Sequence, residues 1–323
     1  MKLLCAAFAV LLGATLLISQ EAKVEDQPAT IKVDVDIVNV LASVRDKKGG
    51  LIGNLTKDDF TIFEDGKQQE IRYFARETDL PLTIGLLVDV SVSQENLIQV
   101  EKQAAYSFLT SVLRKKDMAF LISFGSEAEL LQDFTSSPAL LRSGLDQLRV
   151  NASVGGLHPG PVPTASQPRG TILYDAVYLA ATDRLKSEVG RKVIILITDG
   201  VDQGSRIKLE EAVAAAHRSD AVIYSIYYVD PSIYGRSGGF YRPSDSDLKK
   251  MSEETGGRVF KVDRKHTLPE IFAQLQEEMR TQYALGYTPQ NPDKDGSFRR
   301  IEIKTKGKDQ KVQARRGYYA SKT

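Results

Sequence analysis

A buried strand that ends in short polar side chains is the feature that most restricts how this chain can fold. Residues 82–88 (Leu-Thr-Ile-Gly-Leu-Leu-Val) form a nearly continuous apolar run, which is typical of a parallel strand covered by helices on both faces. Asp89, Ser91 and Ser93 follow this run directly. Ligands of open α/β sheets bind at the carboxyl ends of the strands, and small oxygen-bearing side chains suit a hard divalent cation. We therefore expect a metal site at this edge of the sheet.

Two later segments add polar side chains to the same edge. Residues Val193–Thr198 form a second buried strand, which ends in Asp199 and Gly200. Between the two strands, Thr171 lies just before an apolar helical stretch, so its hydroxyl is expected on a loop at a helix start.

These five positions, in this order and on these elements, resemble the metal-ion-dependent adhesion site (MIDAS) of von Willebrand factor type A (VWA) domains. The resemblance implies that the hydroxyls of Ser91, Ser93 and Thr171 coordinate the metal directly, while Asp89 and Asp199 act through bound water. It also implies that a carboxylate from another protein completes the coordination. Mg²⁺ fits a site of near-octahedral oxygen ligands; the sequence does not separate it from Mn²⁺ or Ca²⁺.

Each of these residues also has a purely structural interpretation. Ser93 could cap a helix, Asp89 could accept from backbone donors, and Asp199-Gly200 is ordinary turn chemistry. Asp175 is left outside the site, because it lies in the first turn of the expected helix, where the macrodipole favours an acid.

Strands and helices alternate from Leu82 to about Tyr287, which predicts an α/β fold with a doubly wound, mostly parallel sheet of the VWA, Rossmann-like type. We place this VWA domain at 80–287. β-patterned segments flank it at 30–78 and 288–323, and each has too few strands for a stable core of its own. We therefore expect the two segments to pack together as one small β-sandwich. Within the first, Phe60–Phe63 and Ile71–Phe74 are expected to form a hairpin around Asp65-Gly66.

The whole arrangement is similar to a family of exported bacterial VWFA-related proteins. The matching runs are Asp59–Gly66 before the VWA domain and Ala314–Tyr319 after it. This resemblance implies architecture and export more than a specific role.

The amino terminus has the layout of a secretory signal over residues 1–22. Lys2 precedes an apolar stretch from Leu3 to Ile18, which is shorter than the roughly 20 residues that span a bilayer. Gln20 stands where a signal peptidase prefers a small residue, so an uncleaved membrane anchor remains an alternative. We expect a protein that is exported to the periplasm, the envelope or the medium, with no membrane contact beyond such an anchor.

Composition removes several classes of function. A net charge of +1 gives no reason to expect a nucleic-acid partner. Cys5 is the only cysteine, so removal of the signal excludes thiol catalysis and disulfides. The three histidines, His158, His217 and His266, are widely spaced and predict structural roles. We therefore expect no enzymatic activity, and the sequence leaves the oligomeric state open.

The sequence favours an adhesion-type module that uses its cation to bind a protein ligand presenting Asp or Glu. A Mg²⁺-dependent phosphohydrolase is the alternative, because such enzymes also place an Asp after a buried first strand. Ser91 argues against it, since phosphatases of the haloacid dehalogenase type carry a second Asp there as general acid. A structural envelope protein with a vestigial site is the third interpretation.

Two long loops are expected beside the metal site and would choose the ligand. The loop after Val229 is rich in aromatic and arginine side chains, which are frequent anchors of protein interfaces: Tyr234, Arg236, Phe240, Tyr241 and Arg242. The second loop, residues 151–170, ends just before Thr171.

Overall fold

The computed structural model describes residues 37–76, 80–150, 170–234 and 243–320. The described residues belong to one compact unit. The expected signal or anchor at residues 1–22 lies outside the described residues. Within the described ranges, no helix has the length and apolar character needed to cross a membrane.

A six-stranded sheet forms the centre of the α/β part, in the order β10-β9-β8-β5-β6-β7. Neighbouring strands are parallel except β7, which runs antiparallel to β6 at one edge. This confirms the predicted doubly wound, mostly parallel sheet. The strand bounds are β5 (Leu82–Asp89), β6 (Met118–Phe124), β7 (Ala128–Thr135), β8 (Arg191–Thr198), β9 (Ala221–Tyr227) and β10 (Val259–Lys261).

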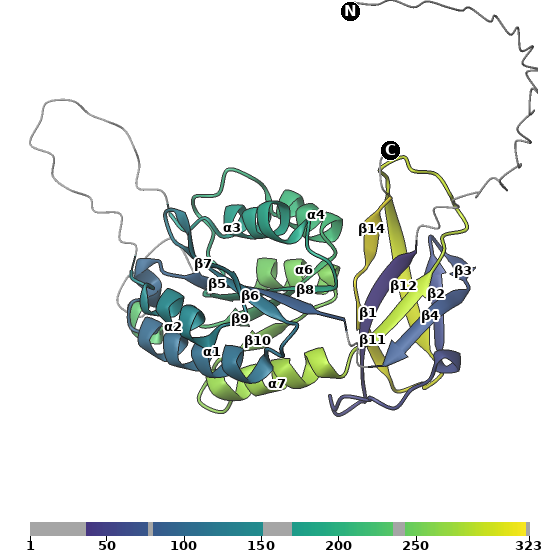
Figure 1. The fold of residues 1–323 in the computed structure, drawn as a ribbon, viewed down its shortest axis with the longest axis horizontal. Helices are drawn as coiled ribbons and strands as arrows, with labels where there is room; N and C mark the ends of the chain where they lie inside the picture. Colours follow the sequence, from purple (N-terminus) through teal and green to yellow (C-terminus); the bar gives the residue numbers. More distant parts are fainter. Residues whose placement is uncertain (1–36, 77–79, 151–169, 235–242, 321–323) are drawn as a thin grey trace, which may run out of the picture. The chain divides into compact units, whose positions relative to one another are not determined.

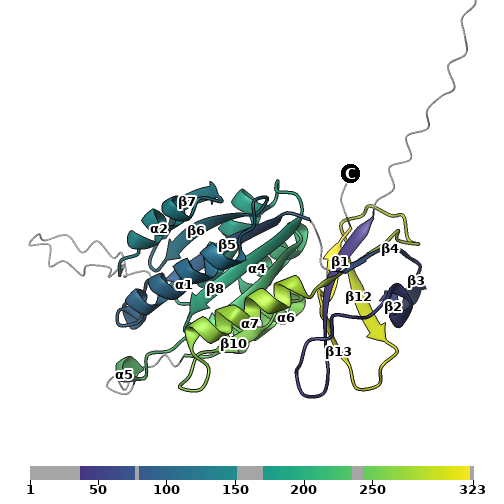
Figure 2. The ribbon, with the colours of Figure 1, turned by 60° about the horizontal axis from the view of Figure 1, so that its bottom comes forward.

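Helices cover both faces of this sheet, as Figures 1 and 2 show. Alternate residues of the central strand point to opposite faces, so Leu86 and Val88 pack in one core and Leu87 in the other. The first core is covered by α1 (Ile98–Val112), α2 (Pro138–Asp146) and α7 (Leu268–Arg280). The second is covered by α3 (Leu173–Leu179) with its π-helical continuation (Ala180–Leu185), α4 (Leu209–Arg218) and α6 (Ser246–Thr255). A short helix, α5 (Pro231–Tyr234), follows β9.

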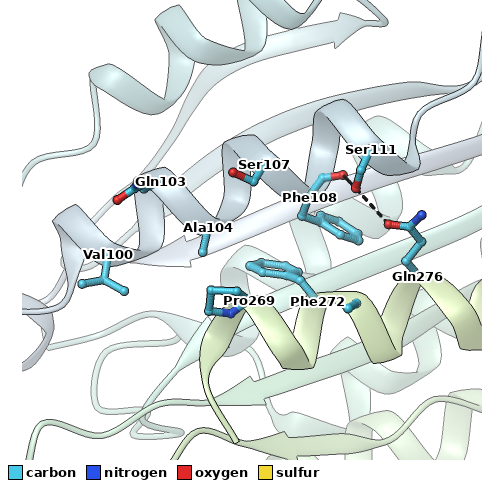
Figure 3. A pocket seen from close by; sticks show the side chains of 10 residues that line it. Val100, Gln103, Ala104, Ser107, Phe108, Ser111, Pro269, Phe272 and Gln276 are labelled. Atoms are coloured by element: carbon cyan, nitrogen blue, oxygen red, sulfur yellow. Dashed lines mark hydrogen bonds between the residues drawn. The ribbon is translucent and has the colours of Figure 1, made fainter.

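Helices α1 and α7 lie side by side on one face, and their contact leaves a shallow groove of about 360 Å³ (Figures 2 and 3). The rings of Phe108 and Phe272 stack with centroids 4.5 Å apart. Near one end, Ser111 Oγ donates a hydrogen bond of 2.8 Å to Gln276 Oε1 (Figure 3). The stacked rings and the hydrogen bond join α7 to α1.

The two ends of the chain build a sandwich of two four-stranded sheets, ordered β13-β1-β11-β4 and β14-β12-β2-β3. This confirms the prediction that the terminal β segments combine into one module. Its core includes Val40, Ile62, Leu285 and Ile301, none of which is more than 5% exposed. The strand bounds are β1 (Val38–Arg45), β2 (Phe60–Glu64), β3 (Lys67–Gln69), β4 (Ile71–Arg76), β11 (Tyr283–Tyr287), β12 (Phe298–Thr305), β13 (Lys311–Ala314) and β14 (Gly317–Tyr319), with a 3-10 turn at Lys57–Asp59.

Two details of the predicted sandwich differ in the structure. The hairpin around Asp65-Gly66 joins β2 to β3, whereas β4 pairs with β11 in the other sheet. Asp65 and Gly66 both have positive φ (47° and 80°), the conformation of a tight two-residue hairpin turn, so the returning strand starts at Lys67. The VWA domain was expected to extend to Tyr287 and so to include β11. In the structure β11 belongs to the sandwich, because it pairs with β1 and β4.

Candidate metal centre

Asp89 is the most buried acid of the candidate site, with no exposed surface at the end of β5. Its Oδ1 accepts a 2.9 Å hydrogen bond from the backbone N–H of Ser91, and its Oδ2 accepts one of 2.6 Å from Thr198 Oγ1. Thr198 is the last residue of β8, so these two bonds fix the carboxylate between the ends of adjacent parallel strands.

A chain of short polar side chains continues from there to Asp199. The hydroxyl oxygens of Ser91 and Ser93 lie 3.0 Å apart, and Ser93 Oγ donates a 2.6 Å hydrogen bond to Asp199 Oδ2. Asp199 Oδ1 in turn accepts from the backbone N–H of Val201 at 3.1 Å. The structure therefore brings four of the five predicted residues together.

The turn between β5 and α1 keeps both serines at this edge. After β5 the chain makes a 3-10 turn over Val92–Gln94 and enters α1 only at Ile98. Ser93 therefore stands in an irregular segment, where its hydroxyl reaches Asp199 instead of capping a helix.

Thr171 lies on the adjoining loop and is largely buried. Its carbonyl oxygen accepts from the backbone N–H groups of Gln203 and Gly204, at 3.0 and 3.1 Å. These bonds tie Thr171 to the segment that follows Asp199. Among the described residues, no hydrogen bond joins the Thr171 hydroxyl to the other four side chains, so its place in the site remains a prediction.

Gly170 permits this close approach. A Cβ on Gly170 would lie 2.4 Å from Gln203 Cβ, nearer than two carbon atoms can pack. The glycine before Thr171 thus lets the two loops pack against each other.

The electrostatics of the site favour a cation. Burial, followed by the negative charge of Asp199, raises the pKa of Asp89 to about 7. Burial also raises the pKa of Glu101 on α1 well above its usual range, with further contributions from Asp89 and Asp199. Within the described ranges, neither Asp89 nor Glu101 forms an ion pair with a basic side chain. A divalent cation would remove the repulsion among these acids.

The donor set fits a cation held mainly by hydroxyls. In the part of the chain that the structure describes, no three His, Cys, Asp or Glu side chains converge as a metal-binding group. Ser91 and Ser93, with Thr171 on the adjoining loop, would therefore have to supply ligands beside the two aspartates. Oxygen-only ligands of this kind suit Mg²⁺, Mn²⁺ or Ca²⁺.

Sequence reasoning missed two residues that shape this edge. Thr198 orients Asp89, and only its position before Asp199 could have indicated this role. Glu101 interrupts the apolar stripe of Ile98, Ala105 and Phe108 on α1, so its helical spacing did indicate a buried acid. Asp175, which was left outside the site, accepts from the backbone N–H groups of Arg206 and Ile207 at 2.9 and 3.1 Å.

The loop that follows β9 starts beside this site. Asp230 Oδ2 accepts a 2.7 Å hydrogen bond from Asn96 Nδ2, and Asp230 Oδ1 accepts from the backbone N–H of Ser232 at 2.8 Å. Asn96 lies three residues beyond Ser93, so the start of the loop is fixed to the metal-site segment. Tyr234 ends α5. The other predicted partner-binding residues, Arg236, Phe240, Tyr241 and Arg242, lie outside the described residues.

Four features decide the fold: the order of the six strands, the antiparallel edge strand, the helices on both faces and the polar cluster after the central strand. The α/β part of this chain has a VWA-like α/β fold. Two loops of this α/β part, those after β5 and β8, carry the candidate metal centre.

Comparison with known proteins gives distant similarities. No protein-family model matches the chain. An uncharacterized protein of Borreliella burgdorferi is 23% identical over 185 residues, which are 54% of this chain and 50% of that protein. The chain thus spans about half the length of this curated relative.

Several solved structures are similar at low identity. The conserved hypothetical protein BatB from Bacteroides thetaiotaomicron is 17% identical with a TM-score of 0.46, over 61% of this chain and 97% of that chain. A von Willebrand factor type A structure from Catenulispora acidiphila is 12% identical with a TM-score of 0.47, over 89% and 74%. Proximal thread matrix protein 1 from the mussel byssus, with a zinc-occupied MIDAS motif, is 17% identical with a TM-score of 0.48, over 66% and 48%. These similarities carry no inference about a ligand or a partner.

Proposed function

We propose that this VWA domain is a non-enzymatic, metal-dependent protein-binding module of the adhesion type. The observation that carries the proposal is the hydrogen-bonded chain from Ser91 through Ser93 to Asp199, next to the buried carboxylate of Asp89. Ser91, Ser93 and Thr171 would hold the cation directly, and Asp89 and Asp199 would act through water. The bound cation would supply an electrophilic face for an Asp or Glu of the partner protein.

Mg²⁺ is the proposed cation, with Mn²⁺ and Ca²⁺ as alternatives. Neutral hydroxyls leave much of the positive charge uncompensated, which an acidic partner residue needs. The chain is proposed to act outside the cytoplasm, as the layout of residues 1–22 predicts.

The accessibility of Asp89 argues against the phosphohydrolase alternative. A nucleophilic aspartate must reach the substrate, whereas Asp89 has no exposed surface and both of its oxygens accept hydrogen bonds from protein donors. Ser91 also stands where such a phosphatase would need its general acid.

Melting curves with and without a divalent metal test the site itself. Saturation at about 100 times the dissociation constant adds roughly 2.7 kcal/mol of stability, which is a shift of about 5–10 °C for a unit of this size. Asp89→Ala should abolish the shift, while Asp146→Ala, which removes an exposed carboxylate on α2, should retain it. No shift with Mg²⁺, Mn²⁺ or Ca²⁺ would instead support the structural protein with a vestigial site.

Capture of partners from envelope and culture medium, with and without EDTA, tests the binding role. We expect at least one partner that is lost with EDTA and with Asp89→Ala. The double variant Tyr241→Ala with Arg242→Ala should weaken that binding at unchanged metal affinity. Phosphatase activity that needs Mg²⁺ and Asp89 would contradict the proposal in favour of the enzyme.

A further inference from the structure

A second cavity, of about 250 Å³, lies at the end of the central sheet opposite the metal centre. Its walls include Arg191 at the start of β8, Ala221 at the start of β9, and Leu41 and Ala284 from the sandwich strands β1 and β11. Strand β8 runs from Arg191 to Thr198, and the seven steps of about 3.3 Å between these residues separate the two sites by roughly 23 Å. The cavity is therefore separate from the candidate metal site.

His217, in the last turn of α4, lines this cavity and is only 4% exposed. Among the described residues, neither ring nitrogen has a hydrogen-bond partner of good geometry; the backbone of Gly317 makes a weaker contact that favours the charged ring. The rings of Phe298 and Tyr319 pack edge-on against His217, with centroids 5.4 and 6.4 Å away. A buried polar side chain without a partner is costly and needs an explanation, such as a ligand or an ordered water molecule. Burial and the charge of Arg315 lower the pKa of His217 to about 4, so the ring is neutral at neutral pH.

Arg315 presents a preoriented guanidinium to the same cavity. One of its terminal nitrogens forms an ion pair with Asp220, and the other donates a 2.5 Å hydrogen bond to the carbonyl oxygen of Asn39. Its Nε is buried and has no hydrogen-bond partner among the described residues. The side chain is therefore held in place before any ligand arrives, and an arginine suits carboxylates in particular.

The lining combines this positive charge with apolar walls. The charged residues of the lining are Arg191, Arg315 and Asp220, and Asp220 is mostly exposed to solvent. Aliphatic and aromatic side chains make up much of the remainder, including Leu41, Leu80 and Tyr73. Apolar walls with a few convergent polar groups are the usual composition of a small-molecule site, and such sites often lie between structural parts.

We propose that this cavity binds a small monocarboxylic acid with an apolar body, whose carboxylate contacts Arg315 and His217. The apolar body lies against Leu41, Leu80 and Tyr73. The ligand then contacts both the α/β part and the sandwich, and its binding stabilises their contact. This site is independent of the metal centre.

Benzoate and benzamide, its uncharged amide, test the proposal on the full chain by calorimetry and by NMR of the His217 ring. We expect benzoate to bind at least tenfold more tightly than benzamide, with a shift of the His217 resonances. His217→Leu should weaken benzoate binding at least tenfold, because it removes the polar ring and keeps an apolar side chain of similar size at this position. His266→Leu, a change at an exposed histidine, is the matched control and should bind benzoate normally.

Two further variants keep the test decisive if His217→Leu does not fold. Leu41→Phe fills part of the cavity without changing its charge, and Arg315→Lys keeps the charge but loses the planar fork; both should weaken benzoate binding several-fold. EDTA and Asp89→Ala should leave benzoate binding unchanged, which separates this site from the proposed metal function. Equal binding of benzoate and benzamide, no binding of benzoate at millimolar concentration, or full binding by His217→Leu would overturn the proposal.

Discussion

The hydroxyl of Ser93 donates a 2.6 Å hydrogen bond to Asp199 Oδ2, joining the loops that follow β5 and β8. If this hydroxyl is also a metal ligand, Ser93→Ala removes one ligand and frees Asp199 from the orientation that the bond imposes. We expect at least a tenfold loss of Mg²⁺ or Mn²⁺ affinity, or about 1.4 kcal/mol. Isothermal titration of the metal-free protein measures it.

Ser107→Ala is the matched control for this change. Ser107 is an exposed serine of α1 and lies away from the loops of the site, so its loss should leave the metal affinity unchanged. Equal affinities of Ser93→Ala and the unmodified protein would show that the Ser93–Asp199 hydrogen bond is a structural contact only.

A buried acid, Glu278 on α7, joins the α/β part to the sandwich. Its Oε2 accepts from Arg45 of β1 and from Arg258, at 2.5 and 2.7 Å, and its Oε1 accepts from Gln313 of β13 at 2.9 Å. The Glu278 side chain has no exposed surface. Removing one member of a buried ion pair leaves its partners uncompensated, so Glu278→Ala should lower the free energy of unfolding by about 3–5 kcal/mol.

The neighbouring residue provides the control. Glu277→Ala removes an exposed carboxylate from the same turn of α7 and should change stability by no more than about 0.5 kcal/mol. Urea unfolding followed by circular dichroism measures both variants. Two equal and small effects would contradict the role of Glu278 in joining the two parts.

The sequence predicted those features that depend on local pattern. The run before Asp89 is apolar throughout and is followed at once by polar side chains. Both the central strand and its polar edge could therefore be inferred. The sandwich was predicted because each terminal segment is too small to fold alone. These inferences needed only spacing, burial and chain length.

Other features depend on long-range pairing, which no local pattern encodes. Ile71–Arg76 has the pattern of a hairpin partner, but pairs with β11, more than two hundred positions away. Thr198 is an ordinary strand residue until β5 brings Asp89 beside it. The cavity around His217 arises only where α4 meets the sandwich, so the sequence indicated a structural histidine and nothing more.

Truncation after Tyr287 tests the dependence of one terminal segment on the other. It removes β12, the partner of β2, and β13, the partner of β1. The hairpin of β2 and β3 would then have no third strand, and an isolated hairpin is marginal in water. Limited proteolysis should cut within residues 57–69 of the truncated chain at conditions that leave the full chain intact. Equal resistance would mean that the amino-terminal segment folds without the carboxyl-terminal one.

Glu101 should make stability depend on pH. An unfolded glutamate has a pKa of about 4.3, whereas burial and the nearby acids raise the pKa of Glu101 well above this in the folded protein. Between these two pKa values the folded form holds a proton that the unfolded chain has released. In the absence of metal, the contribution of Glu101 to the free energy of unfolding is therefore largest below about pH 4.3. It falls as pH rises, by at most about 1.4 kcal/mol per pH unit.

Glu101→Gln replaces the protonated acid with a neutral side chain of the same shape and should remove this decline. Urea unfolding in EDTA, at several pH values from about pH 5 to pH 8, measures the free energy of unfolding of both proteins. The value for the variant should rise relative to that of the unmodified protein as pH rises. Glu95→Gln, a change at an exposed acid before α1, should follow the unmodified protein throughout. Asp89, whose pKa is also raised, is present in all three proteins, so the difference reports the ionisation of Glu101 together with its interaction with Asp89. Parallel stability curves for Glu101→Gln and the unmodified protein would mean that Glu101 ionises in the folded state much as it does in the unfolded chain.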